Sequence, residues 1–170
     1  MTRILLILAV MASPAAAETR YICWRGEGGF TMTGEFSFPD SLAAADLVTE
    51  ADVTAFRIEG WRDGEPLGSW NLSDRTADTT WLLSYAPRQG RFLLGGDSGL
   101  YQAWNANGMV DDCGDPGFGF NAGNAGQDVC VDGVFRADST IAWDTPLLTY
   151  GAPRDPLSCD NAPLMSKARG

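Results

Sequence analysis

Apolar and polar residues alternate without interruption from Phe30 to Phe38, and this pattern constrains the fold more than any other feature of the chain. One face of the segment is apolar and consists of Phe30, Met32, Phe36 and Phe38. A half-buried β-strand has this two-residue period, whereas an amphipathic helix repeats its apolar positions every three to four residues. Pro39 lacks the N–H that a strand needs for its hydrogen-bond ladder. We therefore expect a strand that ends at Pro39.

The Asp63-Gly64 pair predicts a hairpin between the apolar segments on either side of it. A strict two-residue turn would place Ile58 opposite Ser69, an apolar residue against a polar one. A shift of one residue brings Ile58 opposite Trp70 instead. We expect the shifted register, with Gly60 or Gly64 absorbing the extra residue in a bulge or a longer turn.

Further short strands follow along the chain. A second hairpin is predicted around a turn at 87–90, with Tyr85 opposite Phe92 and Leu83 opposite Leu94. Other strands are expected over 101–104, 128–135 and 139–143, and one or two helical turns over 41–52. Many short strands without a long helix predict an all-β fold: a single antiparallel β-sandwich or barrel-like domain with at most one short helix.

The first seventeen residues have the pattern of a secretory signal peptide: a basic start, an apolar run at 4–11, and a small-residue cleavage site at 15–17. This apolar run is too short to span a bilayer, and no membrane span is expected in the mature chain. We expect the mature protein to begin near Glu18 and to be secreted or periplasmic. The β domain would then cover 18–150, and a Pro-rich polar tail would cover 151–170.

The chain contains four cysteines, Cys23, Cys113, Cys130 and Cys159. In an oxidising compartment we expect them to form two disulfides, for which three connectivities exist. We favour Cys113–Cys130, which would close a Gly-rich loop of about 16 residues and contribute roughly 3 kcal/mol. Cys23–Cys159 would then join the two ends of the domain and anchor the tail. A four-cysteine zinc site is the alternative, but the chain has no Cys-x-x-Cys pair.

Composition excludes several classes of function. With 22 Asp and Glu against 12 Lys and Arg, the chain has a net charge of −10, so we expect no nucleic-acid partner. It contains no histidine, which excludes Ser-His-Asp triads and His-ligated metal sites. Its single lysine, Lys167, lies in the predicted tail. Acid–base chemistry would therefore fall to carboxylates, tyrosines or a thiol.

Residues 105–126 are rich in Gly, Asn and Asp and show no periodicity, which predicts a long loop. Its side-chain oxygens are of the type that calcium prefers, and the candidate ligands are Asn105, Asn107, Asp111, Asp112 and Asp115, with Asp128 and Asp132 farther along. The alternative is that these side chains hydrogen-bond to their own backbone in Asx turns. We expect no cofactor other than a calcium ion bound at this loop.

The six tryptophans raise the question of sugar binding, because an indole ring can stack on the apolar face of a pyranose. Trp70 and Trp81 lie on the apolar faces of predicted strands, so we expect them in the core. Trp61 and Trp104 are the candidates for exposure and ligand stacking. The alternative for both is a place in the core, where large aromatic side chains of a sandwich usually lie.

Five segments carry a resemblance to a known group of proteins, and they are Gly34–Phe38, Leu47–Ile58, Trp70–Asp74, Gly117–Asn121 and Ala137–Ile141. They resemble small exported bacterial β-rich proteins of uncharacterised function, several of which carry a C-terminal PEP-CTERM sorting signal. No such signal follows residue 163 of this chain. The resemblance implies an exported β protein and implies no catalytic residues.

The expected function is that of an exported, non-catalytic protein with an interaction or surface-associated role and an unknown partner, such as a glycan or a cell surface. The first alternative is a carbohydrate- or calcium-binding module that uses the loop from Trp104 to Asp132. The second is a carboxylate-dependent hydrolase, which would need two carboxylates facing each other across a cleft.

Overall fold

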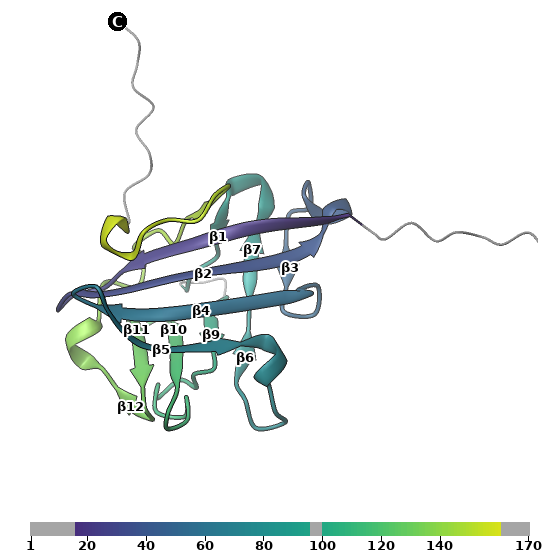
Figure 1. Cartoon of the computed structure of the whole chain (residues 1–170). Coiled ribbons are helices and arrows are strands. Elements are labelled where there is room, and N and C mark those ends of the chain that lie inside the picture. Colours follow the sequence, from purple (N-terminus) through teal and green to yellow (C-terminus); the bar gives the residue numbers. More distant parts are fainter. Residues whose placement is uncertain (1–15, 96–99, 161–170) are drawn as a thin grey trace, which may run out of the picture.

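The computed structural model describes residues 16–95 and 100–160, which form three antiparallel sheets (Figure 1). The first sheet has the order β13-β1-β2-β4-β5, with β1 at Ala17–Arg25, β2 at Phe30–Pro39, β4 at Ala55–Arg62, β5 at Glu65–Asn71 and β13 at Thr149–Tyr150. The second has the order β12-β11-β10-β9-β6, with β6 at Trp81–Leu82, β9 at Gln102–Trp104, β10 at Phe118–Ala122, β11 at Gln127–Val131 and β12 at Val134–Phe135. The small third sheet joins β3 (Val48–Thr49), β7 (Ser84–Ala86) and β8 (Arg91–Phe92).

The sheets form a sandwich-like arrangement, in which the strands of the second sheet run steeply to those of the first (Figure 1). This confirms the predicted all-β antiparallel class. No α-helix occurs among residues 16–95 and 100–160, where the only helical segments are short 3-10 turns. No helix in this described part is long and apolar enough to cross a membrane. Residues 1–15 of the predicted signal peptide and residues 161–170 of the predicted tail lie outside the described residues, whereas Ala17 is the first residue of β1.

The structure confirms the strand that the alternating pattern predicted, which is β2. Its four apolar side chains, Phe30, Met32, Phe36 and Phe38, are at most 2% exposed, and the strand ends at Pro39. The hairpin register is also confirmed, since Ile58 pairs with Trp70. The register shifts between Gly60 and Trp61, where Leu67 of β5 is the extra residue without a partner in β4, so neither Gly60 nor Gly64 absorbs it as predicted. Asp63-Gly64 makes a two-residue turn with positive φ at both positions. The bulge therefore resolves the conflict between the turn and the apolar faces.

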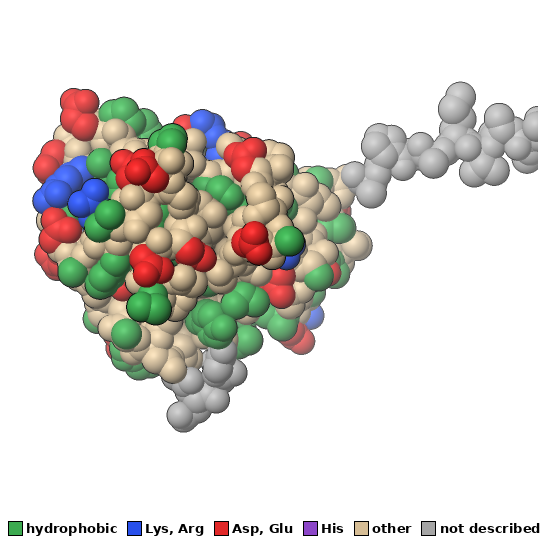
Figure 2. All heavy atoms as spheres, turned by 90° about the horizontal axis from the view of Figure 1, so that it is seen from below, with side chains coloured by type: hydrophobic (Ala, Val, Ile, Leu, Met, Phe, Trp, Pro, Cys, Tyr) green, Lys and Arg blue, Asp and Glu red, His purple; other side chains and the backbone are tan. Residues whose placement is uncertain are grey.

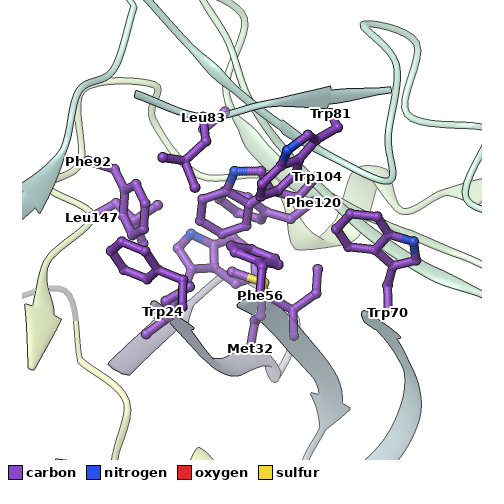
Figure 3. Packing of buried hydrophobic residues seen from close by; sticks show 14 of the residues in the cluster. Trp24, Met32, Phe56, Trp70, Trp81, Leu83, Phe92, Trp104, Phe120 and Leu147 are labelled. Carbon is purple, nitrogen blue, oxygen red and sulfur yellow. The ribbon is translucent and has the colours of Figure 1, made fainter. Parts of the chain in front are cut away.

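The core is a continuous cluster of aromatic and aliphatic side chains from both large sheets (Figure 3). Trp104 is fully buried at its centre, where ring centroids of Phe56, Phe92 and Phe120 each lie 4.9 Å from the indole. The hypothesis that Trp104 is exposed for ligand stacking is therefore wrong, and the alternative, a place in the core, is correct. Strand β9 is paired on both sides, with β6 and β10, so an inward side chain at its end meets the first sheet and not solvent.

Strand β10 lies in the middle of the second sheet, inside a segment predicted to be a loop. Its Phe118 and Phe120 point into the core and are fully buried. Between them, Gly119 approaches the loop backbone so closely that an added Cβ would lie 2.1 Å from the carbonyl oxygen of Asn105. Strand β10 is buried on both faces, and this close contact leaves room only for glycine. The glycine made the segment resemble a loop by composition.

Other predicted elements differ in detail. Residues 41–52 form one 3-10 turn and the short strand β3 instead of α-helical turns. Residues 128–135 hold two strands, β11 and β12, joined by a turn at Asp132-Gly133. The strand predicted at 139–143 is reduced to a single bridge between Ile141 and Gln127. In the second hairpin Tyr85 pairs with Phe92 as predicted, but the strand breaks before Leu83 can pair with Leu94.

Both predicted disulfides are present, Cys23–Cys159 and Cys113–Cys130. The tail segment before Cys159 is held by more than its disulfide. Strand β13 pairs with β1, and the Arg25 guanidinium donates to the carbonyl oxygens of Leu157 and Cys159 at 3.0 and 2.5 Å. Strand β13, which precedes the tail, therefore forms one edge of the first sheet, and the described part of the tail is held to β1 by Arg25 and the disulfide.

Candidate ligand groove over Asp128

Four strands of the second sheet place one row of side chains on its outer face. Leu82 of β6 pairs with Ala103 of β9, Ala103 pairs with Asn121 of β10, and Asn121 pairs with Asp128 of β11. Neighbours along each strand, such as Trp104, Phe120 and Val129, point the other way into the core. The row therefore forms an apolar-to-polar floor that ends in a carboxyl group.

Two loops and the exposed side chains beside them turn this floor into a groove of about 770 Å³, which we call the Asp128 groove. One wall is the loop of Asn107–Val110, and the other is the turn of Gly123–Gly126. Thr80, Tyr101 and Phe135 complete the rim. Tyr101, Met109 and Phe135 are 44%, 74% and 41% exposed, so the groove opens to solvent between apolar side chains.

The Asn107–Val110 wall is fixed in place by the residues around it. Disulfide Cys113–Cys130 ties the loop to β11, and the Asn105 amide donates to the carbonyl oxygens of Cys113 and Phe118 at 2.8 and 3.0 Å. On the groove side, the Asn121 amide donates to the carbonyl oxygen of Asn107 at 3.2 Å. The wall is therefore preformed and does not depend on a ligand for its conformation.

The residues predicted as calcium ligands mostly form hydrogen bonds within and next to this loop. Asp111 accepts from the Asn107 amide, and Asp112 accepts from the Asn107 backbone N–H and from the Thr80 hydroxyl. Asp132 accepts from the Gly117 N–H, and Asp115 is exposed. No group of three or more Asp, Glu, Cys or His side chains that could hold a metal ion occurs among residues 16–95 and 100–160. The Asx-turn alternative describes these side chains, and the predicted set does not assemble into a calcium site.

Asp128 is different from these acids, because its carboxyl group is buried and lacks a partner. The residue is 6% exposed, and its Oδ1 has no hydrogen-bond partner. Its Oδ2 lies over Gly126 of the opposite wall, where an added Cβ would be 3.6 Å away. Burial disfavours the charged form and raises the pKa of Asp128 to about 6. The floor of the groove thus contains a hydrogen-bond acceptor that nothing in the described protein satisfies.

Among the described residues that line the groove none is basic, and apart from Asp128 only Tyr101 has a titratable side chain. A buried, perturbed carboxyl group at the base of an open pocket is a physical marker of a functional site. The described part of the lining contains one carboxyl group, whereas carboxylate-dependent hydrolysis uses a pair.

Trp61 lies on the outer face of the first sheet, opposite in parity to Phe56 and Ile58 as predicted, and is half-buried. It borders a smaller groove of about 250 Å³ together with Tyr21 and residues 153–156. Several polar groups of this groove already have partners. The Trp61 indole N–H donates to the Thr33 hydroxyl at 3.1 Å, and Arg57 pairs with Glu59. Trp61 is thus accessible for stacking, but its surroundings do not demand a ligand as Asp128 does.

Sequence reasoning considered Asp128 only as an additional calcium ligand and did not identify Asn121, Tyr101, Met109 or Phe135. A signal was present: pairing the segments on either side of Gly123–Gly126 as a hairpin would have set Asn121 opposite Asp128. No protein-family model matches this chain, and comparisons with curated proteins and with solved structures gave no match either.

Proposed function

We propose that this chain is an exported, non-catalytic binding protein whose ligand occupies the Asp128 groove. The buried carboxyl group of Asp128 in the lining of the groove, whose Oδ1 has no partner in the described protein, supports this proposal most directly. Leaving a buried acceptor unsatisfied costs about 1 to 3 kcal/mol, more when it is charged, and a ligand that donates a hydrogen bond to this carboxyl group would recover part of that free energy. A preformed groove loses little conformational entropy when it binds.

Two features support the non-catalytic and exported parts of the proposal. Among the described residues that line it, the groove presents one carboxyl group, one tyrosine on the rim, and neither a second carboxyl group nor a thiol. The two disulfides indicate an oxidising, extracellular-type compartment. On this basis we propose secretion or a periplasmic location. The resemblance to small exported proteins supports an interaction or surface-associated role.

A carbohydrate is one candidate class of ligand for this groove. Asn121 and Asp128 place side-chain oxygens next to each other on the floor, and sugar hydroxyl groups can donate to both. Tyr101 and Phe135 on the rim could cover the apolar face of a sugar ring. This candidate retains the loop from Trp104 to Asp132 as the binding element but does not use Trp104 itself, which is buried.

The proposal is tested by NMR on the ¹⁵N-labelled, disulfide-bonded protein with two sets of probes, neutral mono- and disaccharides and small primary amines. We expect at least one set to cause saturable shifts of amides in β10, β11 and residues 107–110. The Asp128→Asn variant should bind that set at least about fivefold more weakly, equivalent to about 1 kcal/mol. Asp78→Asn removes the same charge at an exposed position and should bind as the wild type does.

Two results would overturn the proposal. One is that neither set causes saturable shifts at the groove. The other is that the shifts gather around Trp61 and are unchanged in Asp128→Asn, which would move the binding site to the outer face of the first sheet.

A further inference from the structure

We infer that the ligand of the Asp128 groove is an organic cation, an amine with an apolar body, whose ammonium group reaches Asp128 while its body lies between Tyr101, Met109 and Phe135. This inference rests on the proposed function and specifies the chemical class of its ligand. It follows from the charge of the floor, the character of the rim and the field of the whole molecule.

The first argument concerns the floor. Oδ1 of Asp128 accepts no hydrogen bond, and none of the described residues that line the groove is basic. A ligand hydroxyl group would supply a donor but leave the buried negative charge uncompensated. An ammonium group supplies donors and the opposite charge together, and a charge-assisted hydrogen bond is roughly twice as strong as a neutral one. An anionic ligand would be repelled.

The second argument concerns the rim. Tyr101, Met109 and Phe135 are each more than two-fifths exposed, which is unusual for large apolar side chains gathered around one groove. Aromatic faces attract cations, and a thioether adapts its shape to apolar groups. These side chains suit the hydrocarbon part of an amine and the methylene groups next to its nitrogen.

The third argument concerns long-range charge. The chain has a net charge of −10, and the face shown in Figure 2 carries scattered acidic side chains and few basic ones. Such a field raises the local concentration of cations and their rate of association. An inorganic divalent cation is not the occupant that the groove fits. Calcium needs six to eight oxygen ligands, and this lining offers one carboxyl group within an apolar rim.

A matched pair of probes tests the inference, namely 2-phenylethylamine and 2-phenylethanol. The two have nearly the same shape, and both can donate a hydrogen bond, but only the amine is charged at pH 8. We expect the amine to bind the wild-type protein at least about tenfold more tightly, as measured by NMR titration or calorimetry. In Asp128→Asn, which keeps the shape of the side chain, that preference should disappear. It should persist in Asp78→Asn.

A second variant tests the rim independently of the charge. Tyr101→Ala should weaken binding of the amine about threefold to tenfold through the lost aromatic contact, with unchanged amide spectra for the core strands. If the alcohol binds as tightly as the amine, or if only neutral sugars bind at the groove, the inference is wrong while the proposed function stands. If neither amines, alcohols nor sugars bind there, both are wrong.

Discussion

Replacing Asp128 with asparagine is expected to stabilise the folded protein by about 2 to 3 kcal/mol at pH 8. The reason is the burial that raises the pKa of this carboxyl group from 3.8 to about 6. Each unit of pKa difference between the folded and unfolded states corresponds to about 1.4 kcal/mol once the group is fully ionised. Asparagine has a similar shape and carries no charge, so the variant escapes this cost.

The effect should depend on pH in a defined direction. Because the folded state holds the proton more tightly than the unfolded state, the wild type loses stability as the pH rises from about 4 to about 6. Above that window the penalty is constant, and below it the carboxyl group is neutral in both states. The difference between Asp128→Asn and the wild type should therefore fall below about 1 kcal/mol at pH 4. Desolvation by burial is the cause of the raised pKa of Asp128.

Urea denaturation at several pH values measures this difference. Asp78→Asn is the matched control, because Asp78 is exposed and its replacement makes the same change in net charge. We expect the control to differ from the wild type by less than about 0.5 kcal/mol at every pH. A destabilised Asp128→Asn variant at pH 8 would mean that the carboxylate has a partner that holds it, and the groove would then not demand a ligand.

Removal of the Cys23–Cys159 disulfide is expected to have the largest effect on stability, a loss of about 4 to 5 kcal/mol in a Cys23→Ser/Cys159→Ser variant. The bond joins residues 136 positions apart and so restricts the unfolded chain over most of the domain. The Cys113–Cys130 bond spans 17 positions, and its removal should cost about 3 kcal/mol.

The two disulfides should also differ in their effect on binding. Cys113–Cys130 fixes the loop that forms one wall of the Asp128 groove, whereas Cys23–Cys159 ties the tail to the first sheet. We expect amine binding to weaken in Cys113→Ser/Cys130→Ser and to persist in Cys23→Ser/Cys159→Ser under conditions where that variant is folded. Guanidinium denaturation followed by tryptophan fluorescence gives the stabilities. A smaller loss from the long-range bond than from the short-range one would contradict the chain-entropy explanation.

The fold was predictable where local patterns and long-range packing agree. The alternation in β2 and the need to bury both Ile58 and Trp70 were enough to predict a strand and a bulged register. The disulfides followed from four cysteines and their positions. These features depend on residues whose character matches their environment in the folded protein.

The candidate site was harder to predict because its residues do not match their environment in this way. Gly119 makes β10 resemble a loop, although a close backbone contact requires it. Asp128 is one of 22 acidic residues, and only pairing across the sheet shows that it lies buried beside Asn121. Trp104 was a candidate for exposure because it borders a polar loop, but its indole lies in the core against Phe56 of the first sheet. Non-local pairing determined all three environments.

The most direct test of the proposed site is an NMR titration of the Asp128 carboxyl carbon in the free protein and in the presence of saturating 2-phenylethylamine. In the free protein we expect a pKa of about 6, as burial without a partner requires. With the amine bound, the pKa should fall, because the ammonium group stabilises the charged form. A free-protein value near 3.8, or a pKa that the amine leaves unchanged, would contradict the assignment of Asp128 as the group that the ligand satisfies.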